Sequence, residues 1–306
     1  MVKLCVTFLG TSSAAPTEKR GLPGIAIQRE GALVILDCGE GIQRQLLKLR
    51  LGLNHNTTIL ITHLHGDHVT GLLGLLQTMS LAQRSKPVTI VAPGGLARWL
   101  RLTYETLHIG LTFDIRFVPA RPGRVFRTRD FDFRATRAEH SVEAFSYIVQ
   151  EHDRPGVFFP QKARNLGIPE GKLWSRLQRG RSVKMDDKTF SPGEVMGPRR
   201  PGRRIGYSGD TRPSNRLARF FAGCDLLVFD STFASKDEHR AVERKHSTSQ
   251  EAARVALQAR AKRLVLTHFS ARYRNVSALV REARTIFPTA LAASDGLRLE
   301  VGYPDE

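Results

Sequence analysis

Residues 62–71 read THLHGDHVTG and place three histidines and one aspartate within six positions. Imidazole and carboxylate groups are ligands that Zn²⁺ and Mn²⁺ accept. The preceding stretch TTILIT is typical of a buried strand, which predicts the four groups on a loop at its carboxyl end. Four ligands on one loop cannot all face one tetrahedral ion without strain, so the alternation of side chains predicts two ions. His63 and His65 would bind one ion. Asp67 and His68 would bind the other.

A two-metal site needs further ligands from distant strand ends, and three residues occupy such positions. His140 ends FRATRAEH, Asp210 ends YSGD, and His268 ends LVLTH. Each comes directly after an apolar or alternating run, as His63 does. A single polar residue on a loop would be unremarkable in this position, but the recurrence favours ligands that meet in space.

The charge of the chain points to a polyanionic partner. Its 306 residues include 47 Lys and Arg against 29 Asp and Glu, a formal net charge of +18. Such a balance favours nucleic acid, although an Arg-rich composition would also produce it. Residues 152–204 contain 13 Lys and Arg and 5 Asp and Glu, so this stretch alone contributes +8. Its many prolines and glycines predict a basic arm with little structure of its own. The alternative is a solvated surface insertion.

Elsewhere strand and helix patterns alternate. Strand patterns are CVTFL, ALVILD, TTILIT, PVTIVA, FDIRFV, FRATRA, FSYIVQ, RIGYSG, DLLVFD, RLVLTH and LRLEVG. Helical patterns cover 41–51, 69–83, 214–221, 249–261 and 275–287. This order predicts an α/β fold in which two sheets pack face to face with helices outside. No apolar run reaches the length of a membrane span, and no signal peptide is expected. Cys5, Cys38 and Cys224 lie far apart, as in a reduced, cytosolic protein.

The metal-ligand string and six further motifs resemble a known family. His63-x-His65-x-Asp67-His68 with the three later ligands is similar to the metallo-β-lactamase superfamily. The resemblance narrows to the ribonuclease Z family of tRNA 3′-processing endonucleases and runs from about residue 2 to 301. The motifs that carry it are FLGTSSAAPT, LDCGEGIQRQL, FPQKARNLGIP, YSGDTRP, HSTSQEAA and LTHFSARY.

This resemblance implies a fold, a partner and a cofactor. The fold would be an αββα four-layer sandwich, one domain over 1–306 with residues 152–204 inserted as a basic arm, the exosite. Two Zn²⁺ ions per subunit are implied, with Mn²⁺ as the other option. Three histidines (His63, His65, His140) would hold one ion and Asp67, His68 and His268 the second, with Asp210 bridging. The substrate would be precursor tRNA, cut by a cytoplasmic homodimer in which one subunit's arm serves the other's site. The tRNA would keep a 3′-hydroxyl and the trailer a 5′-phosphate.

The resemblance also assigns catalytic and substrate-binding residues. Asp67 would accept a proton from the attacking water. His246, before the capping-box sequence TSQE, suits protonation of the leaving 3′-oxygen. Asp230 would orient His246, but it stands where the family has Glu, and its side chain is one methylene shorter. Phosphate contacts are expected from the family's Pro-x-Lys-x-Arg-Asn loop, here Lys162, Arg164 and Asn165. The chain also departs from the family at Gly171-Lys172, where Gly-Pro is usual.

Three other functions share some of these features. A related phosphodiesterase acting on small or cyclic nucleotides would use the same metal residues but has no need for a basic arm. A non-catalytic RNA-binding module would not need all seven ligand positions. A thioester or lactam hydrolase of the same fold fits poorly with the charge of the chain and with Asp67.

Overall fold

The computed structural model describes residues 2–303, which separate into two compact units. The first, called the body, comprises residues 2–150 and 204–302. The second, called the arm, comprises residues 151–203 and Tyr303. Among the described residues no helix is long and apolar enough to cross a membrane.

The body contains two seven-stranded sheets, and both are mixed. The first has the order β18 (Arg298–Glu300), β1 (Leu4–Gly10), β3 (Gly24–Arg29), β4 (Ala32–Leu36), β5 (Asn56–Leu60), β6 (Val88–Ala92) and β7 (Ile115–Pro119). It is antiparallel from β18 to β4 and parallel from β4 to β7. The second has the order β17 (Leu291–Ala292), β15 (Leu264–Thr267), β14 (Leu226–Asp230), β13 (Arg204–Tyr207), β10 (Phe145–Glu151), β9 (Phe131–Arg137) and β8 (Gly123–Arg127). Its strands β13, β14, β15 and β17 are parallel. A short parallel pair joins β2 (Ser12–Ser13) to β16 (Phe269–Ser270).

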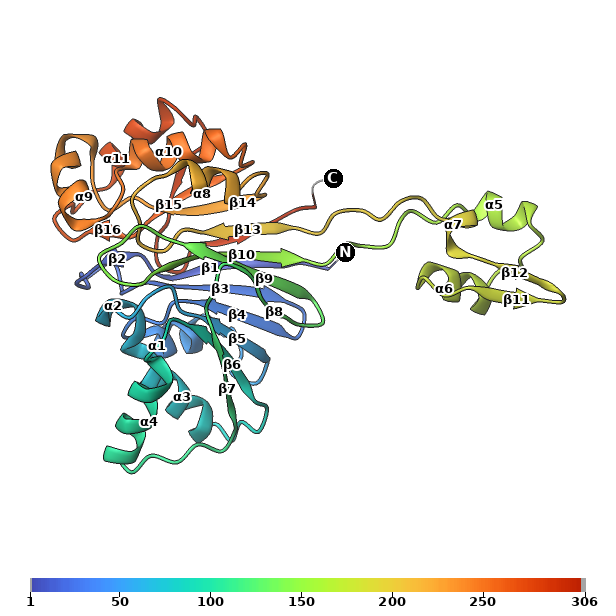
Figure 1. Ribbon diagram of the computed structural model, residues 1–306, viewed down its shortest axis with the longest axis horizontal. Helices are drawn as coiled ribbons and strands as arrows, with labels where there is room; N and C mark the ends of the chain where they lie inside the picture. Colours follow the sequence, from blue (N-terminus) through green and yellow to red (C-terminus); the bar gives the residue numbers. More distant parts are fainter. Residues whose placement is uncertain (1, 304–306) are drawn as a thin grey trace. The chain divides into compact units, whose positions relative to one another are not determined.

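The sheets pack face to face, and helices cover their outer faces (Figure 1). The core between them takes Val6 and Phe8 from the first sheet and Phe133, Tyr147 and Val228 from the second. The outer face of the first sheet packs against α1 (Ile42–Lys48), α3 (Gly71–Leu81) and α4 (Leu96–Thr106). The outer face of the second packs against α8 (Asn215–Phe220), α10 (Ser249–Gln258) and α11 (Ser277–Arg284). The expected αββα layering is therefore confirmed for the body.

Some local predictions need correction. The helix expected over 69–83 is two helices, α2 (Gly66–Val69) and α3, which meet at Thr70. The strand patterns did not include β3 or β8, and the helical patterns did not include α4 or α9 (Glu238–Arg244), which follows the 3-10 turn η1 (Ser235–Asp237). The expected capping box is present, because Thr248 accepts from the backbone of Glu251, whose side chain accepts from the backbone of Thr248.

The prediction that the arm has little structure of its own is wrong. It contains α5 (Pro160–Asn165), α6 (Lys172–Gln178), the hairpin β11 (Val183–Met185) and β12 (Lys188–Phe190), and α7 (Pro192–Val195). A small core binds these elements together, with members Ala163, Ile168, Leu177, Val183, Phe190 and Val195. The apolar residues of this core are few and buried, whereas Val157, Phe159 and Leu166 of the arm are exposed.

Candidate metal centre

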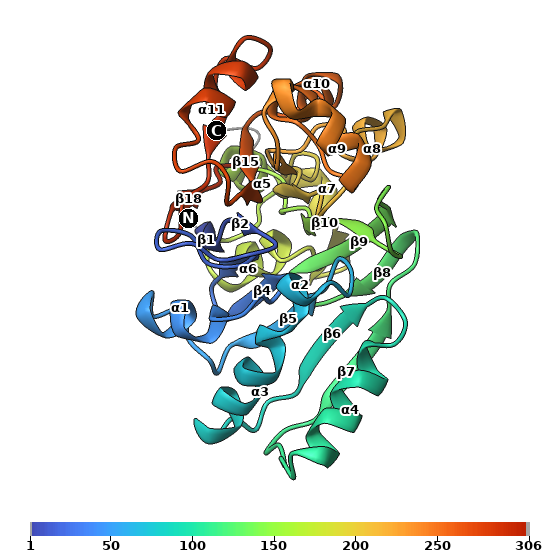
Figure 2. The same ribbon diagram turned by 90° about the vertical axis from the view of Figure 1, so that its left-hand side faces the viewer.

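All seven predicted ligands lie together at the carboxyl ends of strands. Three loops and helix α2 carry them: residues 63–68 after β5, His140 after β9, Asp210 after β13 and His268 after β15. The loop before Asp210 approaches Thr62 closely, where Gly209 has φ +58° and a Cβ would lie 2.7 Å from the Thr62 side chain. Figure 2 shows this edge of the body, with β2, α2 and β10 around it. We call the seven side chains the histidine–aspartate cluster; its members are His63, His65, Asp67, His68, His140, Asp210 and His268.

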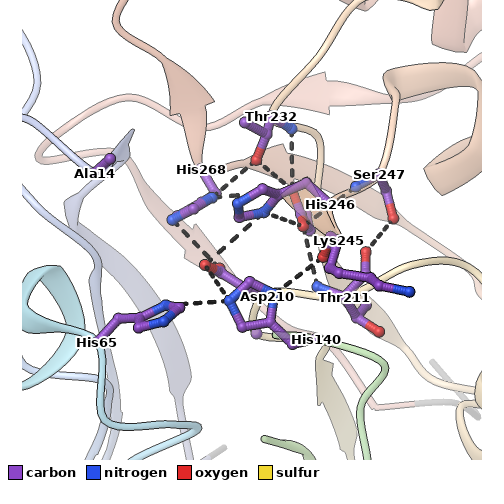
Figure 3. Close-up of polar contacts among 12 residues, drawn as sticks. Ala14, His65, His140, Asp210, Thr211, Thr232, Lys245, His246, Ser247 and His268 are labelled. Carbon is purple, nitrogen blue, oxygen red and sulfur yellow. Dashed lines mark hydrogen bonds and ion pairs between the residues drawn. The ribbon is translucent and has the colours of Figure 1, made fainter. Parts of the chain in front are cut away.

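Two groups of three ligands form within the cluster. Nδ1 of His65 lies 3.1 Å from Nε2 of His63 and 3.1 Å from Nε2 of His140, so three imidazole nitrogens face one point. Figure 3 shows His140 pointing at His65. The second group is Asp67, His68 and His268. Its two imidazoles approach through Nε2 atoms 3.3 Å apart.

Asp210 lies between the two groups. Its Oδ2 is 3.6 Å from Nε2 of His63 and 3.3 Å from Nε2 of His68. Its Oδ1 is 3.3 Å from Nε2 of His268, yet it accepts no hydrogen bond within residues 2–303 although it is buried. A buried carboxylate oxygen without a hydrogen bond, together with the imidazole nitrogens around this carboxylate, provides the ligand atoms that a divalent cation binds. The cluster therefore fits a metal ion in residue type, burial and direction.

In four imidazoles of the cluster, the ring nitrogen that points away from the other ligands is fixed by a hydrogen bond. His63 Nδ1 is 2.9 Å from Thr62 Oγ1, and His268 Nδ1 is 2.9 Å from Thr232 Oγ1. His140 Nδ1 lies 3.0 Å from the carbonyl oxygen of Lys245. Metal-bound histidines in proteins are oriented in this way, with the second ring nitrogen bonded to an oxygen. The ring directions in the cluster are thus set by the fold.

Asp37 holds the fourth imidazole and was missed as a site residue. Its Oδ2 lies 2.8 Å from His68 Nδ1 and accepts from the hydroxyl of Tyr207 at 2.8 Å. Its Oδ1 accepts from the backbone N–H of Thr62 at 2.7 Å. Asp37 is fully buried and has φ +57°, a strained conformation for a residue other than glycine. The signal was present, because Asp37 belongs to the quoted motif LDCGEGIQRQL.

The electrostatics divide the imidazoles of the cluster: burial favours the neutral forms of His63 and His140. For His68, burial is outweighed by the charges of Asp210 and Asp37, which raise the pKa well above its ordinary value. Burial, assisted by the neighbouring His68, lowers the pKa of His63 to about 2, and burial also lowers the pKa of His140. For Asp210 burial favours the neutral acid, but the imidazoles of His268 and His68 outweigh it and hold the pKa well below its ordinary value. Neutral imidazole and charged carboxylate are the forms that bind metal ions.

His246 and Asp230 form a pair beside the cluster. His246 Nδ1 is 3.0 Å from Asp230 Oδ2, so the shorter carboxylate does reach the imidazole. Asp230 is buried and also accepts from the backbone N–H groups of Thr211 at 3.1 Å and Ser247 at 3.3 Å. Burial lowers the pKa of His246, but the charge of Asp230 and its hydrogen bond outweigh burial and raise the pKa to about 9. The imidazole of His246 is therefore protonated at neutral pH and could donate that proton. Figure 3 shows His246 beside Asp210 and His268.

The three expected phosphate-binding residues lie in the arm. Lys162, Arg164 and Asn165 are on α5, so the stretch expected as a loop is a helix. Lys162 is exposed, with Nζ 4.8 Å from the ring centre of Phe159. Arg164 is exposed and paired with Glu170 at 2.7 Å.

Comparison with known proteins identifies the family. Residues 4–153 match the family described as anti-Pycsar protein Apyc1, and residues 178–269 match the β-lactamase superfamily domain. The ribonuclease Z of Nitrosopumilus maritimus (strain SCM1) is 45% identical to the chain over 296 residues, covering 97% of the chain and 99% of that protein. The chain belongs to the ribonuclease Z family. A further ribonuclease Z, from Salinibacter ruber (strain DSM 13855 / M31), is 43% identical and covers 98% of the chain and 95% of its own length.

Solved structures agree with this assignment to the ribonuclease Z family. Human tRNase Z, short form, has a TM-score of 0.72 and 29% identity, covering 97% of the chain and 99% of its own. The metallo-β-lactamase fold protein YhfI from Bacillus subtilis has a TM-score of 0.70 at 18% identity, a likeness of fold alone. The resemblance inferred from the motifs is thus confirmed for the family and for the fold.

Proposed function

We propose that this ribonuclease Z family member is a metal-dependent endoribonuclease that removes 3′ trailers from precursor tRNA at the histidine–aspartate cluster. The observation that carries the proposal is the convergence of three imidazole nitrogens on one side of Asp210 and of two imidazoles with Asp67 on the other. Family membership indicates precursor tRNA as the substrate, since the relatives bear the names ribonuclease Z and tRNase Z.

The cluster would hold two divalent cations, which we propose to be Zn²⁺, with Mn²⁺ as the other option. His63, His65 and His140 would bind one, Asp67, His68 and His268 the second, and Asp210 both. When bound, two such cations neutralise the charge of the scissile phosphate and lower the pKa of the attacking water.

Asp67 is suited to accept the proton of that water. Burial favours its neutral form, but the hydrogen bond and charge of His268 and the charge of His68 outweigh burial and hold the pKa below its ordinary value. Its Oδ2 also accepts from the backbone N–H of Ala14 at 2.9 Å, which fixes the carboxylate. A fixed, ionised carboxylate can act as a general base without reorganisation.

His246 would supply the proton that the leaving oxygen takes. Attack of water on phosphorus breaks the bond to the 3′-oxygen, and the N–H of His246 protonates that oxygen. The tRNA then carries a 3′-hydroxyl and the trailer a 5′-phosphate. Asp230 would hold the imidazole through Nδ1 and leave Nε2 to donate.

The arm would bind the folded tRNA through its phosphates. Lys162, Arg164 and Asn165 would contact the acceptor end, and the remaining basic residues would hold the duplex by shape and backbone. We propose one domain over 1–306 with the arm inserted, acting as a homodimer in which one subunit's arm serves the other's site. Cys5, Cys38 and Cys224 are free and buried, which supports a reduced, cytoplasmic setting.

Product mapping on one precursor tRNA tests the proposal. The expected result is a single cut that yields a 3′-hydroxyl on the tRNA, lost on chelation and restored by Zn²⁺ or Mn²⁺. A phosphodiesterase acting on small or cyclic nucleotides would instead hydrolyse those substrates and leave the precursor uncut.

A further inference from the structure

The β8–β9 hairpin carries a second concentration of positive charge, which the proposed function does not use. Residues 113–137 contain seven arginines and three aspartates, with no other charged residue, and all seven arginines are exposed. The hairpin belongs to the body, whereas the +8 stretch noted above lies almost entirely in the arm.

The strand register places three of these arginines, Arg124, Arg127 and Arg134, on one face. Arg124 pairs directly with Arg134, and Arg127 pairs with Asp132. The intervening Phe133 points into the core between the sheets, so the four residues face outward. Like charges directly opposite each other destabilise a sheet. The pair of Arg124 and Arg134 therefore lowers the stability of the sheet. Its presence indicates a partner that neutralises the two positive charges.

The acidic residues on this face do not balance the charge. Asp132 is shared, at 4.0 Å from Arg124 and 3.7 Å from Arg127. Arg134 forms no ion pair within the part of the chain that the structure describes. The guanidinium groups therefore remain available to an anion, and their fork geometry suits phosphate.

The strand that carries Arg134 ends near the metal centre. β9 ends at Arg137, three residues before His140, whose Nε2 lies 3.1 Å from His65. Arg216 of α8 donates to the carbonyl oxygen of Arg137 and adds a further charge there. From Arg137 back to Asp132 the strand spans roughly 17 Å. Figure 2 shows β8 and β9 running side by side. A polyanionic strand leaving the cluster along this hairpin would meet Arg134 and Arg124 and then Arg127. Arg137 itself lies on the opposite side of β9 from Arg134, as Phe133 and Ala135 do, and it pairs with Glu143 at 3.2 Å. We call Arg124, Arg127 and Arg134 the hairpin arginine face.

We propose that the hairpin arginine face binds the single-stranded 3′ trailer of the precursor, on the far side of the scissile phosphate from the tRNA. This inference rests on the proposed function, in which the arm holds the tRNA. The face holds phosphates without reading bases, because guanidinium groups on a strand contact the RNA backbone. Trailer length, and not trailer sequence, then sets the strength of binding.

The test uses one tRNA with a one-nucleotide or a twelve-nucleotide trailer and compares kcat/KM for the two. The double variant Arg124→Gln/Arg134→Gln is matched by Arg254→Gln/Arg281→Gln, which removes two exposed arginines from α10 and α11. Wild type and the matched control favour the long trailer. In the hairpin variant this preference falls at least about fivefold. The slope of log affinity against log salt concentration for the long substrate also falls in magnitude by about two. Arg134→Lys keeps most of the preference because the charge remains.

Three outcomes would overturn the trailer proposal. They are a wild type indifferent to trailer length, a hairpin variant with unchanged preference, and an equal loss on both substrates, which would assign the face to the tRNA itself. Thermal unfolding checks the fold, and removing the like-charged pair should leave the midpoint unchanged or higher. Failure of the proposed function is distinct, since wild type would then cut neither substrate at the tRNA 3′ end.

Discussion

In the body, four of the seven groups of the histidine–aspartate cluster are buried, and four of its five imidazoles also have a hydrogen-bond partner on the ring nitrogen that points away from the cluster. His68 is fully buried between Asp37 and Asp210, and His63 is held by Thr62. In the arm, Lys162 and Arg164 are exposed on a six-residue helix over a small core. Buried, fixed groups can tune a metal centre and its proton transfers, whereas exposed cations attract phosphates with little geometric demand. This contrast supports the proposed division, with chemistry in the body and substrate capture in the arm.

Removing the group that joins the two halves of the cluster should have the largest effect. Asp210→Ala is expected to lower kcat by on the order of 10⁴ or more, as when any member of a catalytic unit is lost. Binding of precursor tRNA in a gel-shift assay should change little. Asp225→Ala is the matched control, because Asp225 is also a buried carboxylate but contacts Arg204 and Lys262 away from the cluster. A parallel loss of tRNA affinity in Asp210→Ala would argue against the division of labour.

Replacing His246, the proposed general acid, should lower kcat less than replacing Asp210. His246→Asn is expected to lower kcat by about 10²–10⁴, with bound metal unchanged, because general acid catalysis contributes that much. The raised pKa of His246 predicts that wild-type activity falls on the alkaline side as the imidazole loses its proton. In Asp230→Asn the charge that raises this pKa is gone, so the alkaline limb of the pH profile should move to lower pH. An unmoved limb would show that another group donates the proton.

Replacing the arm should separate substrate capture from chemistry. Arg154 and Arg200 pair as neighbouring antiparallel residues, with backbone bonds of 2.8 and 3.0 Å, so a two-residue Asn-Gly turn can replace residues 155–199. Processing of precursor tRNA is expected to fall on the order of a hundredfold through lost phosphate contacts. Hydrolysis of a chromogenic phosphodiester should persist. An equal fall in both activities would mean that the arm also supports the metal centre.

The smallest effect is expected from replacing Asp37, which contacts the ring nitrogen of His68 that points away from the other ligands. Asp37→Asn keeps the shape of the side chain but removes its charge, so metal affinity should fall about 10–100-fold. Competition with a graded series of chelators measures this change. Wild-type affinity in Asp37→Asn would mean that Asp37 serves packing of the Thr62 and Tyr207 contacts alone.

Much of the body could be predicted from sequence because its signals are local. Apolar strands ending in His or Asp mark the carboxyl edge of a sheet, where parallel strands bring their ends together. Asp37 was not predicted as a site residue because its role depends on Thr62, His68 and Tyr207, which only the folded sheets bring near it. The elements of the arm could not be predicted because its helices are short and its six-residue core is spread over 163–195, too sparse for periodicity to reveal. The hairpin arginine face depends on register, which strand patterns do not specify.

The central claim is that the histidine–aspartate cluster binds two divalent cations. Metal analysis of the protein purified from Zn²⁺-containing medium tests it most directly, with Asp210→Ala measured alongside. The account predicts about two equivalents of Zn²⁺ or Mn²⁺ per chain in wild type and a clear loss in the variant. Wild-type protein that is folded yet carries no transition metal, and takes up none on titration, would contradict it.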